Sequence, residues 1–88
     1  MKYLVTSTFN QPPTDAIIAL IPAEIARGKE LDAQGLRLKL YVAADQSGAW
    51  QIYRGDTEAD VRKAIESLPL HPFVATTITP LADDPAFE

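Results

Sequence analysis

The chain has 88 residues, no cysteine, and 12 acidic against 8 basic side chains, which gives a net charge of −4 at neutral pH. Its length allows a single domain over residues 1–88, with a core so small that association with a second copy would add considerably to its stability. The absence of cysteine excludes disulfides and thiolate chemistry, and the scattered Lys and Arg residues argue against nucleic acid as a partner.

No membrane partner is expected either. The longest apolar run, residues 16–21, is far shorter than the roughly 20 residues that span a bilayer. The first residues turn polar too early for a signal peptide. We therefore expect a cytoplasmic protein.

Residues 2–9 alternate between two faces, with Tyr3 on one and Leu4 on the other, and this pattern predicts a strand. Two prolines stop the strand, and Thr14 is a suitable N-cap for the helical segment 15–33. Pro22 interrupts that segment.

Because proline cannot donate an intrahelical hydrogen bond, Pro22 either kinks the helical segment or opens a second helical segment as its N1 residue. Gly35 follows the segment at the position of a left-handed C-cap.

Residues 36–42 alternate again and predict a second strand, joined by a turn at 45–48 to a third strand over 49–54. The apolar face of the second strand is expected to hold Leu36, Leu38, Leu40 and Val42. On the third strand, Trp50 and Tyr53 point to opposite faces, and either face is compatible with meeting the helices.

Thr57 is expected to cap a second helix, whose apolar residues at positions i, i+3, i+4 and i+7 are Val61, Ala64, Ile65 and Leu68. Pro69 ends this helix. Residues 73–81 predict the last strand, and residues 82–88 form an acidic tail.

The element order β-α-β-β-α-β predicts an α+β fold, the ferredoxin-like plait, with a four-stranded antiparallel sheet and two helices on one face. The other face of such a sheet needs a cover. We expect a homodimer in which two sheets face each other, or a higher homo-oligomer.

Few kinds of chemistry are open to this composition. With one histidine and no cysteine, the spacing of the carboxylates matches no metal-binding motif, and the four glycines stand singly rather than in a phosphate-binding loop. We therefore expect no metal and no cofactor, which leaves proton chemistry on a small-molecule substrate, or binding alone.

Glu24 is the first candidate catalytic residue. At helical spacing it shares an arc with Ile21, Ile25, Gly28 and Leu31, an arc expected to face the sheet, and Asp32 falls in the same arc. A carboxylate turned toward a core loses hydration, which raises its pKa toward the range of a general base. Arg27, one turn away, is suited to pair with Glu24 or to hold an anionic ligand. Alternatively, Glu24 is the N3 residue of a helix that begins at Pro22 and only stabilises the helix dipole.

His71 is the second candidate catalytic residue, because its ordinary pKa near 6.5 suits acid–base work and Pro72 fixes the backbone beside it. An exposed histidine in a turn is equally compatible with no role. The strand aromatics are candidates for the wall of a substrate site or for a dimer interface: Tyr3, Tyr41, Trp50 and Tyr53.

The run Leu68-Pro69-Leu70-His71-Pro72-Phe73, followed by Thr79-Pro80-Leu81-Ala82 and Pro85, resembles the C-terminal signature of the muconolactone Δ-isomerase family. Tyr3-Leu4-Val5 and Ala26-Arg27-x-Lys29 are similar as well. The resemblance implies a dimeric α+β barrel, often assembled into larger rings. It also implies an intramolecular isomerase that moves a proton within a small unsaturated lactone during aromatic-compound breakdown, without metal or cofactor. Glu24 or His71 would then act as the base, with Arg27 or Lys29 as the anion clamp.

Departures from this family pattern favour a less charged ligand. Asp45-Gln46 stands where isomerases tend to carry Gly-Arg, Asp83-Asp84 replaces basic residues, and His71 replaces an aromatic residue. Two other functions therefore stay open: a non-catalytic dimeric binding or assembly module, and a cofactor-free oxygenase or cyclase acting on an aromatic polyketide-like ligand.

Overall fold

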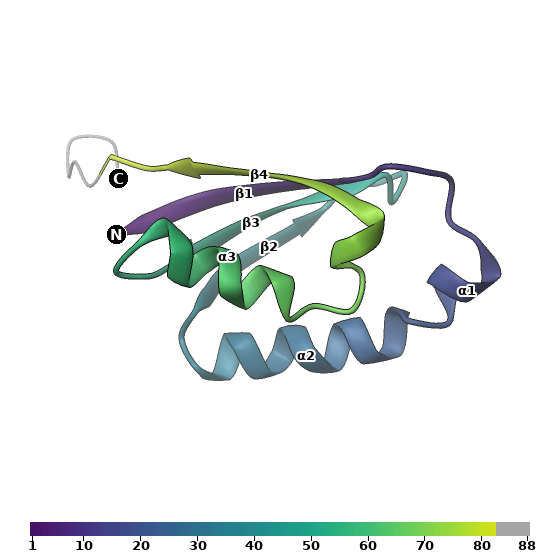
Figure 1. The fold of residues 1–88 in the computed structure, drawn as a ribbon, viewed down its shortest axis with the longest axis horizontal. Helices are drawn as coiled ribbons and strands as arrows, with labels where there is room; N and C mark the ends of the chain where they lie inside the picture. Colours follow the sequence, from purple (N-terminus) through teal and green to yellow (C-terminus); the bar gives the residue numbers. More distant parts are fainter. Residues whose placement is uncertain (83–88) are drawn as a thin grey trace.

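The computed structural model describes residues 1–82 and is drawn in Figure 1. Its elements are β1 (Lys2–Phe9), α1 (Asp15–Ile18), α2 (Ile21–Ala33), β2 (Arg37–Val42), β3 (Gly48–Arg54), α3 (Glu58–Glu66), the 3-10 turn η1 (His71–Phe73) and β4 (Val74–Pro80). Apart from Ala82, the acidic tail predicted over 82–88 lies outside the described residues.

The four strands form one antiparallel sheet in the order β2-β3-β1-β4. The long helices α2 and α3 lie on one side of it (Figure 1). This arrangement is the predicted ferredoxin-like plait. The central strand β1 pairs along its length with both β3 and β4, so it has no free edge.

The segment predicted as helical over 15–33 is two helices. The Thr14 hydroxyl accepts a hydrogen bond from the Ile17 amide at 3.3 Å, which caps the single turn α1. Pro22 lies in the first turn of α2, where its missing N–H has no intrahelical acceptor to lose. Of the two predicted roles for Pro22, the structure therefore shows the start of a second helix. Gly35 follows α2 with φ of 75°, the left-handed conformation that glycine adopts without strain.

The side-chain alternation predicted for 36–42 is wrong in its first half. Arg37 pairs with Tyr53 and Lys39 with Ile52, so Leu38 is an extra residue in β2 and forms a β-bulge. One extra residue in a strand turns the side chains before it to the opposite face of the sheet. Arg37 therefore lies on the helix side. It shares that side with Leu40.

The last strand begins one residue later than predicted. The His71 amide donates to the Leu68 carbonyl at 3.0 Å, and the Phe73 amide donates to the Leu70 carbonyl at 2.9 Å. These bonds close the tight turn η1, and Pro72 lies inside it rather than at the start of β4. The predicted cap of α3 is confirmed, with the Thr57 hydroxyl accepting from the Asp60 amide at 3.2 Å.

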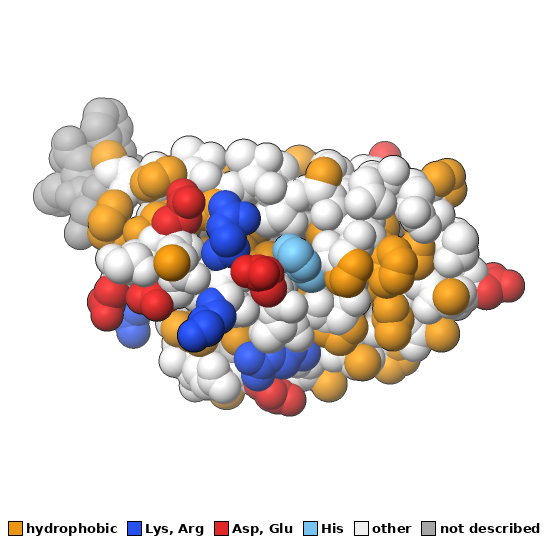
Figure 2. Space-filling model, viewed as in Figure 1, with side chains coloured by type: hydrophobic (Ala, Val, Ile, Leu, Met, Phe, Trp, Pro, Cys, Tyr) orange, Lys and Arg blue, Asp and Glu red, His pale blue; other side chains and the backbone are white. Residues whose placement is uncertain are grey.

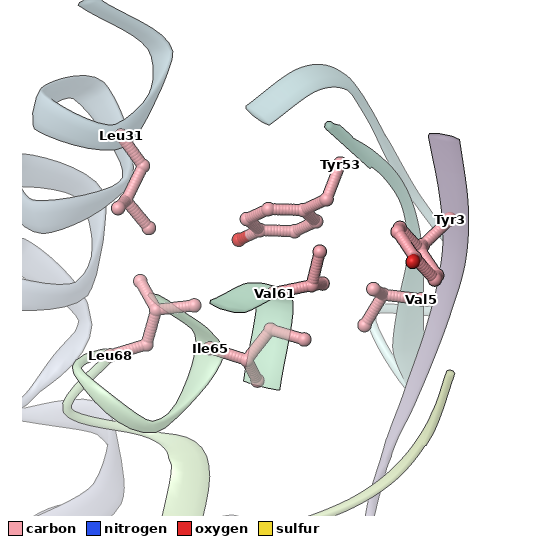
Figure 3. Packing of buried hydrophobic residues seen from close by; sticks show 7 residues of the cluster. All are labelled: Tyr3, Val5, Leu31, Tyr53, Val61, Ile65 and Leu68. Carbon is pink, nitrogen blue, oxygen red and sulfur yellow. The ribbon is translucent and has the colours of Figure 1, made fainter. Parts of the chain in front are cut away.

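The core lies between the helices and the helix side of the sheet. Figure 3 shows its buried side chains, which are Tyr3, Val5, Leu31, Tyr53, Val61, Ile65 and Leu68. The arc predicted to bury one side of α2 is only half correct. Gly28 and Leu31 are buried, but Ile21 and Ile25 remain 39% and 53% exposed, because only the C-terminal half of α2 reaches the core.

Leu31→Ala should lower the free energy of unfolding by about 2–5 kcal/mol, because it removes a fully buried side chain and leaves a cavity. Urea denaturation measures the change. Ile25→Ala on the same helix is the matched control and should cost less than about 1 kcal/mol, since Ile25 is half exposed. Equal losses in the two variants would contradict this account of α2.

Candidate functional site

Glu24 lies on the sheet-facing side of α2 and is half-buried. Its Oε1 accepts a hydrogen bond from the Leu70 amide at 2.8 Å, in the segment that joins α3 to η1. The helix begins at Ile21, so Glu24 lies in its first turn, where a carboxylate favours the helix dipole, and its Oε1 also binds a different part of the chain.

Burial raises the pKa of Glu24 above its ordinary value near 4.5, although the Leu70 amide and the charge of Arg37 both oppose the rise. The desolvation effect is the largest of the three. A carboxyl group with this pKa is better suited to accept and return a proton near neutral pH than an exposed one.

Glu24, Gly28 and Asp32 follow each other at intervals of four residues, so they lie on one face of α2. The guanidinium of Arg37 lies against this face at Gly28, where an added Cβ would stand 2.6 Å from Nη2 and 2.9 Å from Nη1. Glycine is therefore required there for the guanidinium to approach the helix. The Arg37 side chain is only 10% exposed.

Asp32 holds the guanidinium with two hydrogen bonds. Arg37 Nε donates to Oδ1 at 2.7 Å and Nη2 donates to Oδ2 at 3.1 Å. These bonds lower the pKa of Asp32 and raise that of Arg37. The pair carries opposite charges at any pH near neutrality.

Tyr53 and Gln51 lie on the sheet beneath this face of α2. The Tyr53 hydroxyl donates to Gln51 Oε1 at 3.0 Å, and both residues are buried. Figure 3 shows the hydroxyl of Tyr53 directed toward the side of α2. Burial raises the pKa of Tyr53 to about 12, so the phenol stays protonated and remains a hydrogen-bond donor.

Arg27 bonds to other partners than Glu24. Its Nε donates to the Ser67 hydroxyl at 3.0 Å and its Nη1 pairs with Glu30 at 2.8 Å. The first bond joins α2 to the end of α3. The Arg27 charge still acts on Tyr53, whose pKa it lowers slightly against the larger effect of burial.

His71 opens η1, one residue after the amide that Glu24 accepts from. It is partly buried. Figure 2 shows the histidine side chain at the surface of the face that carries α3. The Glu24 carboxylate is thus hydrogen-bonded to the backbone of the residue that directly precedes His71.

The four aromatic candidates lie on opposite sides of the sheet. Tyr3 and Tyr53 are in the core on the helix side. Tyr41 and Trp50 are cross-strand partners on the open face, where they are 60% and 46% exposed. Within one chain, the sheet separates this open-face pair from Glu24.

Two groups that act on Glu24 were not expected from the sequence: the Leu70 amide and Arg37. Simple alternation assigns Arg37 to the face opposite Leu40, and the bulge at Leu38 reverses this. The i, i+4, i+8 spacing of Glu24, Gly28 and Asp32 was visible in the sequence and marked the correct face of α2.

Elsewhere, a hollow lies at the other end of α2 and is lined by Met1, Gln34, Gly35, Leu36, Arg54, Gly55, Asp56 and Asp60. It contains none of the predicted site residues. In the part of the chain that the structure describes, no three His, Asp or Glu side chains gather to hold a metal ion. No helix among residues 1–82 has the length and apolar character needed to cross a membrane.

These features define a small α+β plait protein with a half-buried carboxylate on the sheet side of the long helix α2. The sequence profile of the family described as muconolactone delta-isomerase matches residues 1–86, and the chain belongs to this family. The sequence matches none of the curated proteins compared with it.

Solved structures share the fold. The crystal structure of muconolactone isomerase has a TM-score of 0.83 at 18% identity, covering 98% of this chain and 93% of that one. A 5-chloro-2-hydroxyhydroquinone dehydrochlorinase from Burkholderia phenoliruptrix, in complex with 2,5-dihydroxybenzoquinone, has a TM-score of 0.75 at 17% identity, over 96% of each chain. Rv0793 from Mycobacterium tuberculosis has a TM-score of 0.58 at 20% identity, covering 97% of this chain and 99% of that one.

The raised pKa of Glu24 predicts a specific dependence of stability on pH. The folded state holds the Glu24 proton more tightly than the unfolded chain, so ionising the carboxyl costs folding free energy. As the pH rises from about 4.5 through the folded-state pKa, the free energy of unfolding of the wild type should fall relative to that of Glu24→Gln. Urea unfolding of both proteins between about pH 4 and about pH 8 measures this difference.

Asp32→Asn is the control with the opposite sign. Because the pKa of Asp32 is lowered on folding, its contribution to stability is present above its ordinary value near 3.8 and is lost as the pH falls through the folded-state pKa. If the difference in the free energy of unfolding between the wild type and Glu24→Gln stays constant with pH, the raised pKa of Glu24 is contradicted.

Proposed function

We propose that this protein catalyses the cofactor-free isomerisation of a small unsaturated lactone or carbonyl compound by proton transfer, with Glu24 as the base. The observation that carries the proposal is the half-buried Glu24 carboxylate, held by the Leu70 amide on the side of α2 that faces the sheet. Membership in the muconolactone delta-isomerase family supports the same reaction class.

The proposed reaction needs one base that works twice. Glu24 takes a proton from a carbon next to the carbonyl group, and the electron pair of the broken C–H bond moves into a dienolate. The protonated Glu24 then returns the proton to a different carbon of the same system. No atom is gained or lost, so neither a metal nor a redox partner is required. The Leu70 amide keeps the carboxylate in place during both transfers.

The ligand that fits these surroundings is a small ring with few charges. Arg37, the cation whose charge acts on Glu24, is already paired with Asp32. Apolar side chains are left exposed on the helix side of the edge strand β2, where Leu40 is 44% and Val42 is 59% exposed. The planar, oxygenated ring bound to the structurally similar dehydrochlorinase agrees with a ligand of this kind.

The remaining predicted residues have distinct proposed roles. Tyr53 keeps its proton for the hydrogen bond to Gln51, and with Tyr3 beside it on β1 it forms the buried floor of the site beneath α2. Arg27 contributes positive charge at the junction of α2 with α3. His71 is proposed as a second proton carrier, beside the segment that holds Glu24.

Glu24→Gln should lower kcat/KM by about 10²–10⁴-fold on any unsaturated lactone that the wild type isomerises, because the amide cannot accept the proton. His71→Ala should retain more activity than Glu24→Gln, since the histidine lies at the surface. A panel of unsaturated lactones and small enones, followed by absorbance, measures both.

Arg62→Gln is the control for activity, because Arg62 lies on α3 in an exposed ion pair with Glu58 and should leave turnover unchanged. If Glu24→Gln turns over every substrate as fast as the wild type, Glu24 is not the base. A ligand that binds without being converted would favour the binding-module function instead.

Assembly through the open face of the sheet is the second part of the proposal. This face carries the exposed Tyr41–Trp50 pair, with Leu4 and Ile52 partly buried beside it. A second copy placed against it would bury these apolar side chains, and the contact would give the dimer that the family resemblance implies. Tyr41 and Trp50 would then serve the interface and reach a ligand only through the assembly.

Trp50→Glu should weaken self-association at least about tenfold, because a large aromatic side chain at the centre of the interface is replaced by a charge. Sedimentation at micromolar concentration measures the oligomeric state. Val42→Glu places the same charge at an exposed apolar position on the opposite face and should leave association intact. A wild-type protein that sediments as a monomer would contradict the two-sheet dimer.

A further inference from the structure

One face of α2 carries two carboxylates with a gap between them. Glu24 and Asp32 lie two helical turns apart, and Gly28 stands midway without a side chain. The Arg37 guanidinium fills this gap, since a Cβ at Gly28 would meet its Nη2, Nη1 and Cζ atoms at 2.6, 2.9 and 3.0 Å. Residues one turn apart on a helix are about 5–6 Å apart at Cβ, so the cation lies within reach of both carboxylates.

The two carboxylates are used differently. Asp32 is exposed and binds the guanidinium with two hydrogen bonds. Glu24 is half-buried and takes its hydrogen bond from the Leu70 amide instead. Arg37 is therefore anchored at one carboxylate while its charge acts on the other.

Every element packed around Glu24 contributes to this electrostatic setting. Asp32 and Arg27 come from α2, Arg37 from β2, and Tyr53 from β3, and all three charged residues act on the Tyr53 hydroxyl together with Glu24. The segment after α3 supplies the Leu70 amide, and His71 follows it. Arg37 is the member of this set whose position depends on both the β-bulge at Leu38 and the glycine at position 28.

We propose that Arg37 is a positioning residue of the site, anchored by Asp32 over Gly28 so that a fixed positive charge faces Glu24 while it takes up and returns a proton. The inference rests on the proposed function of Glu24 as the base. When Glu24 accepts a proton from the substrate carbon, its negative charge disappears and an equal charge forms on the dienolate oxygen. Arg37 therefore faces one negative charge before and after the transfer, and it limits the electrostatic cost of moving that charge.

The direct test is the titration of Glu24 itself, followed by carbon NMR of the side-chain carboxyl groups in the full-length protein. The Glu24 signal is assigned by its absence in Glu24→Gln. In Arg37→Gln the midpoint of Glu24 should rise by more than about 0.2 pH unit, because a nearby opposite charge favours the ionised carboxylate. Arg62→Gln is the matched control, and in it the midpoint should move by less than about 0.2 unit.

Asp32→Asn gives a second measurement that does not remove the cation. It deletes a negative charge and frees the guanidinium to approach Glu24, so the Glu24 midpoint should fall. This variant decides the question if Arg37→Gln does not fold. A midpoint within about 0.2 unit of the wild type in Arg37→Gln, or a midpoint in Asp32→Asn that does not fall, would overturn the proposal.

A purely structural role for Arg37 would appear as lower stability to urea with an unchanged Glu24 midpoint, and this too would overturn it. The titration needs no substrate, so its outcome is independent of whether Glu24 is the base. If Arg37→Gln shifts the midpoint while Glu24→Gln remains active on every substrate, the electrostatic inference holds and the proposed function fails.

Discussion

The pairing of β1 on both of its edges is the constraint on which the rest of this structure depends. With β3 on one side and β4 on the other, every second residue of β1 must face the helices. Tyr3 and Val5 therefore enter the core, where Leu31 of α2 and Val61 of α3 meet them. A shift of β1 by one residue would place Leu4 and Thr6 there instead, and both helices would lose their packing surface.

A local irregularity in the edge strand decides the character of the site. The bulge at Leu38 lets β2 turn Arg37 toward the helix side while it keeps Leu40 there as well. The absence of a side chain at Gly28 then gives the guanidinium a place against α2. Without either feature, the face of α2 that carries Glu24 would hold two carboxylates and no counter-charge between them.

The same face shows how the surroundings of a side chain can shift the pKa of a carboxyl group in opposite directions. Burial raises the pKa of Glu24, whereas the Leu70 amide and Arg37 lower it, so the final value reflects opposing effects of the surroundings. The charges of Glu24 and Arg37 also act on Tyr53, but burial has the largest effect on its pKa and the phenol stays neutral.

The sequence by itself determined the elements and their order. Alternation along 2–9, the Thr57 cap and the helical spacing of Val61 and Ile65 are local patterns, and each predicted the observed element because short-range sterics and hydrogen bonds decide it. The arc that joins Glu24 to Leu31 on α2 was visible for the same reason. The run around His71 was enough to suggest the family.

Only the tertiary structure decided which of these residues meet. The facing of Arg37 depends on a bulge, whose position follows from pairing with β3 rather than from the residues of β2. The hydrogen bond from Leu70 to Glu24 joins residues 46 positions apart, and no local pattern encodes it. The separation of Tyr53 from Trp50 likewise follows from which sheet face the helices cover. Contacts between distant segments depend on the packing of the whole chain, and that packing places Glu24 and Arg37 on the same side of the molecule.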